Sequence, residues 1–100
     1  MVKMTILFRH PLDEANFEQH YVDALALIEK LPNIQRRQAC LVLGSPAGRS
    51  PYRRILELYF ADNDQMDAAL RSAEGAAAGA LLMRTIGRDV EIIFADVYEE

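Results

Sequence analysis

The segment YRRILELYF, residues 52–60, decides the fold because it predicts a strand at the centre of an α+β pattern. Most of its side chains are aromatic or branched, and such residues are enriched in strands. Leu56 and Leu58 alternate with Ile55 and Tyr59, so apolar groups fall on both faces of the strand. Both faces of the sheet are therefore expected to be covered.

Elements on both sides of this strand complete the pattern. Two glycines and two prolines between residues 44 and 51 predict a loop before it, and "ADND" after it supplies side chains that can cap a helix. The helix that follows is expected to break near Ser72 and to restart through the alanines to Met83. The other predicted elements are strands over 2–9, 34–43 and 90–98 and a helix capped by Asp13 that ends near Pro32.

The order β-α-β-β-α-β is that of the ferredoxin-like fold, an α+β class with an antiparallel sheet and both helices on one face. With 100 residues the chain is expected to form one domain, 1–100. Ile93 and Ala95 would add to an apolar surface on the second sheet face. A second copy packed face to face would cover it, which predicts a homodimer. The alternative is that loop 44–51 or the C-terminal segment covers it.

Composition excludes several classes of protein. Lysine plus arginine total 11 and aspartate plus glutamate total 15, and this net charge of −4 argues against a nucleic-acid partner. Cys40 is alone and the two histidines are far from it, so neither a disulfide nor a metal site is expected. No apolar stretch approaches the roughly 20 residues of a membrane span, and the N-terminal apolar run is too short for a signal peptide. A soluble, cytoplasmic protein without a membrane partner is expected.

A histidine interrupts the apolar stripe of the first predicted helix, NFEQHYVDALALIEKLPNI, residues 16–34. Phe17, Tyr21 and Ala24 share one side at steps of three and four, and His20 lies among them, where it should point toward the sheet. An imidazole can act as a general acid or base near neutral pH, so His20 is the catalytic candidate if it faces a cavity. In a sealed core it would instead be a neutral side chain held by one hydrogen bond.

Four more side chains are candidate ligand-binding residues. Tyr21 joins an apolar ring to a polar tip, although core packing is the alternative. Glu57 lies in mid-strand, where it could orient an imidazole in a pocket or pair with an arginine across the sheet. Tyr52 and Tyr59 could line the same pocket, and periodicity leaves open which sheet face holds it. His10 is interpreted as a turn residue at the end of a strand.

Several short motifs occur in the order and spacing of a known family. With them, the chain resembles the EthD family of the dimeric α+β barrel superfamily over almost its whole length. The motifs are "HP.D" from His10, "F..HY" from Phe17, "LP" from Leu31, "LG.P.G..PY" from Leu43, "ELYF" from Glu57 and "S.EG" from Ser72.

The resemblance implies breakdown of a small organic compound beside an oxygenase system. Together with the position of His20, it leads us to expect a pocket for an apolar ligand between the first helix and the sheet. Related barrels include cofactor-free monooxygenases and lactone isomerases, so neither a metal nor an organic cofactor is expected. The alternative is a non-catalytic dimeric module that binds a hydrophobic small molecule or supports an oxygenase. One departure matters, because members often carry a second histidine a turn after "HY" and HYVDALALIEKLP has none. A mechanism that relies on that histidine is not expected here.

Overall fold

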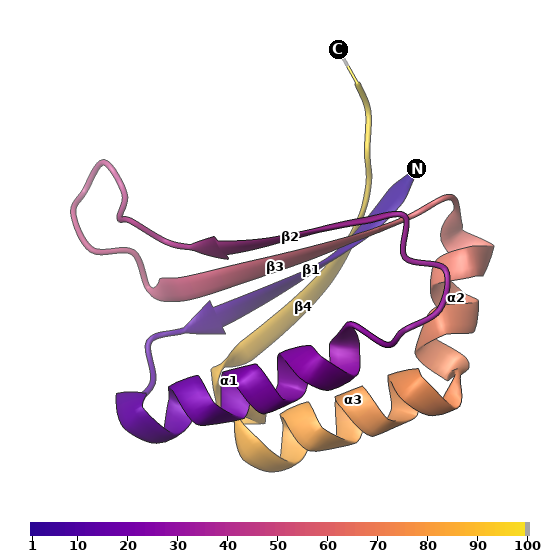
Figure 1. Cartoon of the computed structure of the whole chain (residues 1–100). Coiled ribbons are helices and arrows are strands. Elements are labelled where there is room, and N and C mark those ends of the chain that lie inside the picture. Colours follow the sequence, from indigo (N-terminus) through magenta and orange to yellow (C-terminus); the bar gives the residue numbers. More distant parts are fainter. Residues whose placement is uncertain (100) are drawn as a thin grey trace.

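The computed structural model describes residues 1–99, which form a two-layer α+β fold with the predicted order of elements (Figure 1). The sheet has the strand order β2-β3-β1-β4, and every neighbouring pair is antiparallel. This is the ferredoxin-like arrangement. The elements are β1 (Val2–Arg9), α1 (Glu14–Ile28), β2 (Arg36–Leu41), β3 (Tyr52–Phe60), α2 (Asn63–Arg71), α3 (Ala73–Thr85), the 3₁₀ turn η1 (Gly87–Asp89) and β4 (Val90–Asp96).

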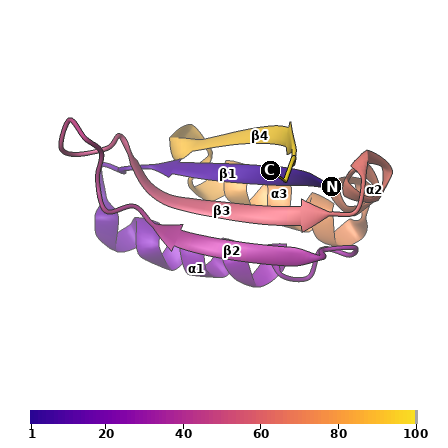
Figure 2. The ribbon, with the colours of Figure 1, turned by 90° about the horizontal axis from the view of Figure 1, so that it is seen from above.

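The helices α1 and α3 lie along one face of the sheet, here called the helix-covered face, while the other is called the open face (Figures 1 and 2). The register places Ile6 of β1 between Leu56 of β3 and Ile92 of β4. Antiparallel partners share a face, so these three point toward the helices. None of the helices formed by residues 1–99 is long and apolar enough to span a bilayer.

The core lies between the helices and the central strands β1 and β3. On α1 the buried row is Phe17, Tyr21, Ala24 and Ile28, as the spacing of three and four predicts. The alternation expected in the strands is confirmed as well, because each central strand buries every second side chain against the helices. These strand residues are Val2, Met4, Ile6, Phe8, Leu56, Leu58 and Phe60.

The predicted break in the second helical segment is confirmed and occurs at Ser72. The Ser72 hydroxyl donates to the carbonyl oxygen of Ala69 at 2.6 Å and accepts from the backbone N–H of Gly75 at 3.0 Å, so it ends α2 and caps α3. A Cβ atom at Gly75 would lie 2.3 Å from the Ala69 carbonyl oxygen. The "S.EG" sequence is therefore explained by the junction between two helices.

The open face carries the apolar side chains expected from the sequence, but charged pairs lie beside them, so the face is only partly apolar. Lys3 donates to Glu57 at 2.5 Å, and Arg9 pairs with Glu91. The register causes this, since it brings basic residues of β1 beside acidic residues of β3 and β4. Between these pairs Ile93 is exposed, so apolar and charged groups alternate across the face.

Candidate functional site

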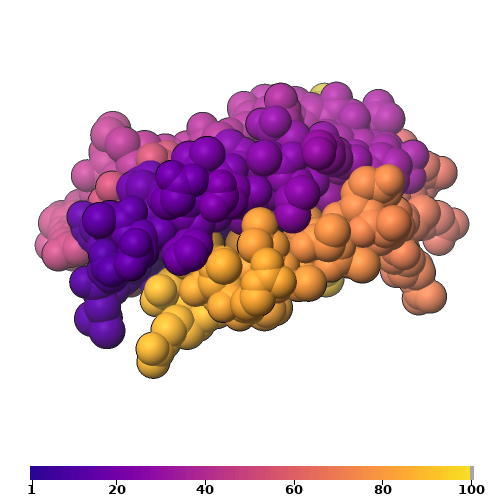
Figure 3. Space-filling view, turned by 60° about the horizontal axis from the view of Figure 1, so that its bottom comes forward, coloured from indigo at the N-terminus to yellow at the C-terminus, as the bar shows by residue number. Residues whose placement is uncertain are grey.

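A groove of about 520 Å³ lies where the start of α1 approaches the end of α3. We call it the histidine groove because both histidines of the chain line it. Figure 3 views this side, with the indigo start of α1 beside the yellow-orange end of α3. Its lining residues are His10, Pro11, Leu12, Asp13, Asn16, Phe17, His20, Thr85, Ile86, Arg88 and Asp89.

His20 is half-buried and reaches the groove from the second turn of α1. Successive helical residues are about 100° apart, so a position three after Phe17 lies on the flank of the buried row, toward α3. The structure therefore places His20 in a groove beside α3 and η1, whereas the sequence stripe predicted that it faces the sheet. Phe17 and Ile86 give this groove an apolar floor, because both are buried.

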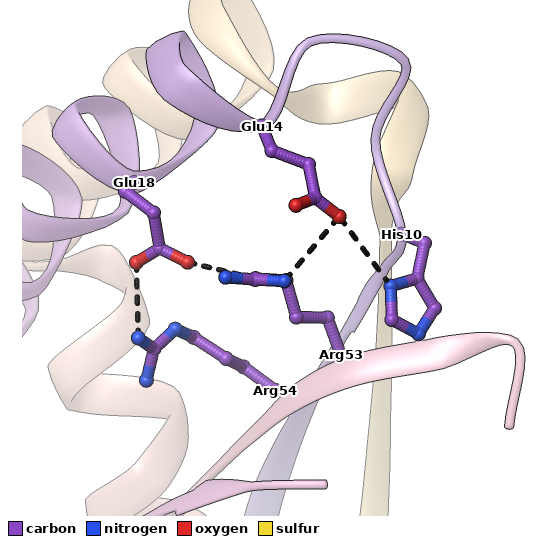
Figure 4. A network of polar contacts seen from close by, with 5 residues as sticks. All are labelled: His10, Glu14, Glu18, Arg53 and Arg54. Carbon is purple, nitrogen blue, oxygen red and sulfur yellow. Dashed lines mark hydrogen bonds and ion pairs between the residues drawn. The ribbon is translucent and has the colours of Figure 1, made fainter. Parts of the chain in front are cut away.

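His10 lines the same groove from the segment between β1 and α1. Its backbone N–H donates to the carbonyl oxygen of Pro51 at 3.1 Å, which ties this segment to the start of β3. The ring nitrogen Nδ1 is buried, has no hydrogen-bond partner within residues 1–99 and lies 3.9 Å from Oε1 of Glu14 (Figure 4). Sequence reasoning interpreted His10 as a turn residue and missed the shared groove. The sequence signal that could have indicated the shared groove is that His10 lies only four residues before Glu14, the first residue of α1.

A charged network beside the groove ties α1 to β3 (Figure 4). Arg53 donates to Glu18 at 2.7 Å and to Glu14 at 3.3 Å, while Arg54 donates to Glu18 at 2.9 Å. Partial burial acts to raise the pKa of the Glu18 carboxyl group. The hydrogen bonds and charges of the two arginines outweigh burial and hold this pKa below its usual range. Glu18 is therefore ionised at neutral pH and anchors the start of the helix.

Tyr21 lies in the core and is not among the side chains that line the histidine groove. Its ring packs edge-to-face on Phe8, with 5.1 Å between the centroids. Burial raises the pKa of its hydroxyl, and the charge of Arg54 opposes that rise. The hydroxyl is buried without a hydrogen-bond partner among the described residues.

The remaining candidates lie on the open face, with the sheet between them and His20. Tyr52 donates to Glu91 at 2.8 Å, and Tyr59 donates to Glu57 at 3.3 Å. Glu57 pairs with Lys3, which confirms a cross-strand pair but with a lysine in place of the predicted arginine. The structure therefore separates Tyr52, Glu57 and Tyr59 from the histidine and brings His10 to it.

The space between the helices and the sheet holds a small apolar cavity of about 60 Å³. Ligand pockets usually enclose about 300 to 1,000 Å³, so this cavity is too small for a substrate and the histidine groove has the required size. A groove of about 600 Å³ at the end of α1 is lined by Lys30, Arg36 and Arg37 and holds no histidine. Residues 1–99 contain no group of three or more side chains suited to hold a metal ion.

These features place the chain among the ferredoxin-like α+β proteins with a groove beside the first helix. The EthD domain matches residues 9–97, and the chain belongs to the EthD family. An uncharacterised 11.0 kDa protein from the thcB–thcC intergenic region of Rhodococcus erythropolis is 32% identical, with 96% of this chain and 94% of that protein covered.

Solved structures agree with the fold. An EthD family protein from Bacillus halodurans matches with a TM-score of 0.92 and 28% identity, covering 98% of this chain and 99% of that one. A dimeric ferredoxin-like protein of unknown function from Jannaschia matches with a TM-score of 0.75 and 14% identity, covering 97% of this chain and 100% of that one.

Proposed function

We propose that this EthD protein carries out proton transfer on a small, largely apolar organic compound bound in the histidine groove. The observation that carries the proposal is the position of His20, whose half-buried imidazole lines a groove of about 520 Å³ with an apolar floor. Imidazole is suited to general acid–base catalysis near neutral pH, and such a step requires neither a metal ion nor an organic cofactor. The expected setting is catabolism of an organic compound beside an oxygenase system, as the family resemblance implies.

The groove has the composition that such a ligand requires. Phe17 and Ile86 can contact an apolar body, while Asn16 and Thr85 lie in the lining and can hydrogen-bond a polar substituent. His20 lines the same groove as both kinds of group. A ligand that binds with its polar substituent toward His20 would present its acidic proton to the imidazole.

The proposal includes a homodimer formed by the open faces of two sheets. Ile93 is exposed there, and the charged pairs Lys3–Glu57 and Arg9–Glu91 provide groups that a second copy could also contact. The ferredoxin-like protein from Jannaschia is described as dimeric, which supports the same assembly for this chain. A dimer through the open face would leave the histidine groove accessible, because that groove lies on the helix-covered side.

A non-catalytic binding module is the second candidate. The separation of Glu57 from His20 by the sheet favours it, because no carboxylate of the open face can orient the imidazole. An enzyme and a binding module would both bind an apolar compound, but only an enzyme would move protons faster than buffer. A measurement of turnover is therefore needed to distinguish them.

The experiment follows the exchange of the α-protons of cyclohexanone in D₂O by NMR. We expect exchange above the buffer rate, and a loss of at least about tenfold in His20→Gln, which removes the base and keeps a polar side chain. Gln19→Ala is the matched control, since Gln19 is the neighbouring exposed residue and is absent from the groove lining. Exchange at the buffer rate, or equal exchange in His20→Gln, would overturn the proposed activity.

A further inference from the structure

We propose that His10 is the second proton-transfer residue of the histidine groove, and that the groove accepts an enolisable carbonyl compound whose reacting carbon and oxygen lie between two imidazoles. This inference rests on the proposed function. Two observations support it: His10 and His20 line the same groove, and the buried Nδ1 atom of His10 has no hydrogen-bond partner in the described part of the chain.

The surroundings of His10 place its ring beside a carboxylate of α1. Nδ1 lies 3.9 Å from Oε1 of Glu14 (Figure 4), so we infer that the opposite nitrogen, Nε2, is the one that meets a ligand. Glu14 is itself held, because Arg53 donates to it at 3.3 Å. The backbone hydrogen bond from His10 to Pro51 fixes the position of the segment. A histidine whose backbone is tied to the start of β3 and whose ring lies beside α1 is suited to act as a positioned acid or base.

The second imidazole has a chemical consequence. A single base can remove a proton from carbon, but it leaves negative charge on the carbonyl oxygen. With two imidazoles, His20 removes the α-proton while protonated His10 donates a proton to that oxygen. The electrons of the C–H bond form the carbon–carbon double bond, and the carbonyl π electrons form the O–H bond with the proton from His10. His20 gains an N–H bond and His10 loses one. The step needs no oxidant or reductant, and proton exchange with water restores both rings.

The sequence pattern of the family did not predict two imidazoles in this groove. The stretch after His20 lacks the second histidine that EthD relatives often carry a turn later, and the sequence therefore predicted a site with one imidazole. The structure supplies a second imidazole from before the helix. The hydrogen bond from His10 to Pro51 joins the segment "HP.D" to the loop "LG.P.G..PY" before β3. This loop therefore helps to keep His10 in position.

The test uses the full chain, whose two histidines give two resolvable ring signals in the NMR spectrum. 4-Nitrophenol serves as the binding probe, since it has an apolar ring and a weakly acidic hydroxyl group. We expect both ring signals to shift saturably with the same Kd. We also expect His10→Asn and His10→Gln to lower cyclohexanone exchange at least about tenfold, with partial rescue by added imidazole. Gln19→Ala should retain the parental rate.

The outcomes separate this inference from the proposed function. If His20→Gln loses exchange while both His10 variants keep it, His10 has no role and the single-imidazole activity stands. If neither ring signal responds to 4-nitrophenol and exchange stays at the buffer rate, both proposals fail. The inference would be overturned if both His10 variants lost exchange without rescue by imidazole and also unfolded at a lower midpoint of denaturant. That result would show a structural role for His10.

Discussion

The guanidinium group of Arg54 lies over the ring of Tyr21, with 4.6 Å between Cζ and the ring centroid. The same arginine donates to Glu18 at 2.9 Å, so one side chain of β3 contacts two positions of α1. Cation–π contacts of this kind contribute about 0.5 to 2 kcal/mol, depending on how far they are desolvated. Yet the hydroxyl of Tyr21 and Nε of Arg54 are both buried without hydrogen-bond partners among the described residues.

The Tyr21 hydroxyl is expected to contribute nothing to stability. Tyr21→Phe removes a buried polar atom that lacks a partner and keeps the ring, so the free energy of unfolding should stay unchanged or rise by up to about 1 kcal/mol. Tyr21→Ala, the control, should lower it by about 3 to 5 kcal/mol because it also removes the buried ring. Denaturant titration measures both. A loss of more than about 1 kcal/mol in Tyr21→Phe would show that the hydroxyl has a partner such as water.

Acid should weaken the anchoring of α1 through Glu18. Its pKa in the folded protein is lowered, so its stabilising contribution is complete above the unfolded value near 4.5 and is lost as the pH falls through the lower folded value. Glu18→Gln should therefore reduce stability at pH 7 by about 0.5 to 1 kcal/mol, a modest amount because the side chain is about one-third exposed.

The measurement for Glu18 is a series of urea titrations between pH 7 and pH 3. The difference between parent and Glu18→Gln should shrink in the acid range. Glu29→Gln is the control, since Glu29 forms a single, more exposed pair with Arg37. A difference between parent and Glu18→Gln that stays constant down to pH 3 would contradict the prediction.

Removing the His20 side chain should cost little stability, because the imidazole lines an open groove. We expect His20→Ala to lower the free energy of unfolding by about 1 kcal/mol or less. Phe17→Ala, one turn earlier on the same helix and fully buried, should cost about 3 to 5 kcal/mol. If His20→Ala costs as much as Phe17→Ala, the imidazole is a core side chain and the site loses its first candidate base.

Replacing glycine with alanine should change the stability of the fold in opposite directions at the two glycines of α3. A Cβ atom at Gly75 would meet the Ala69 carbonyl oxygen at 2.3 Å, so Gly75→Ala should cost about 1 to 3 kcal/mol. A Cβ atom at Gly79 would meet nothing within 4 Å, and Gly79→Ala should add up to about 1 kcal/mol through helix propensity. Thermal unfolding of both variants provides the measurement. An unaffected Gly75→Ala would mean that the Ser72 junction can move.

The homodimer can be tested with adjacent residues that point to opposite faces of β4. The parent should scatter light as a particle of twice its 11.3 kDa chain mass at micromolar concentration. Ile93→Asp places a charge on the open face and should give the monomer mass, while Ile92→Asp, on the helix-covered face, should keep the dimer mass. A parent of 11.3 kDa, or dissociation by Ile92→Asp alone, would contradict an open-face dimer.

Local signals in the sequence were sufficient for the elements and their order. The alternation of Leu56 and Leu58 with Ile55, the caps at Asp13 and Asp62, and the break at Ser72 each act within a few residues, so they can be recognised without knowing the tertiary contacts. The predicted strand over 34–43 was the least exact. Its regular part is Arg36–Leu41, although the backbone N–H of Val42 still donates to the carbonyl oxygen of Arg53 at 2.8 Å.

The sequence by itself determined that this chain forms a ferredoxin-like domain with a histidine on the first helix. Only the tertiary structure decided which residues meet that histidine. Glu57 pairs with Lys3 because of the β1–β3 register, and His20 shares a groove with His10 because α1 packs beside α3. Periodicity reports the face of one element, whereas a site depends on how several elements are placed against one another. That placement follows from packing the whole core, and no segment of the sequence contains it alone.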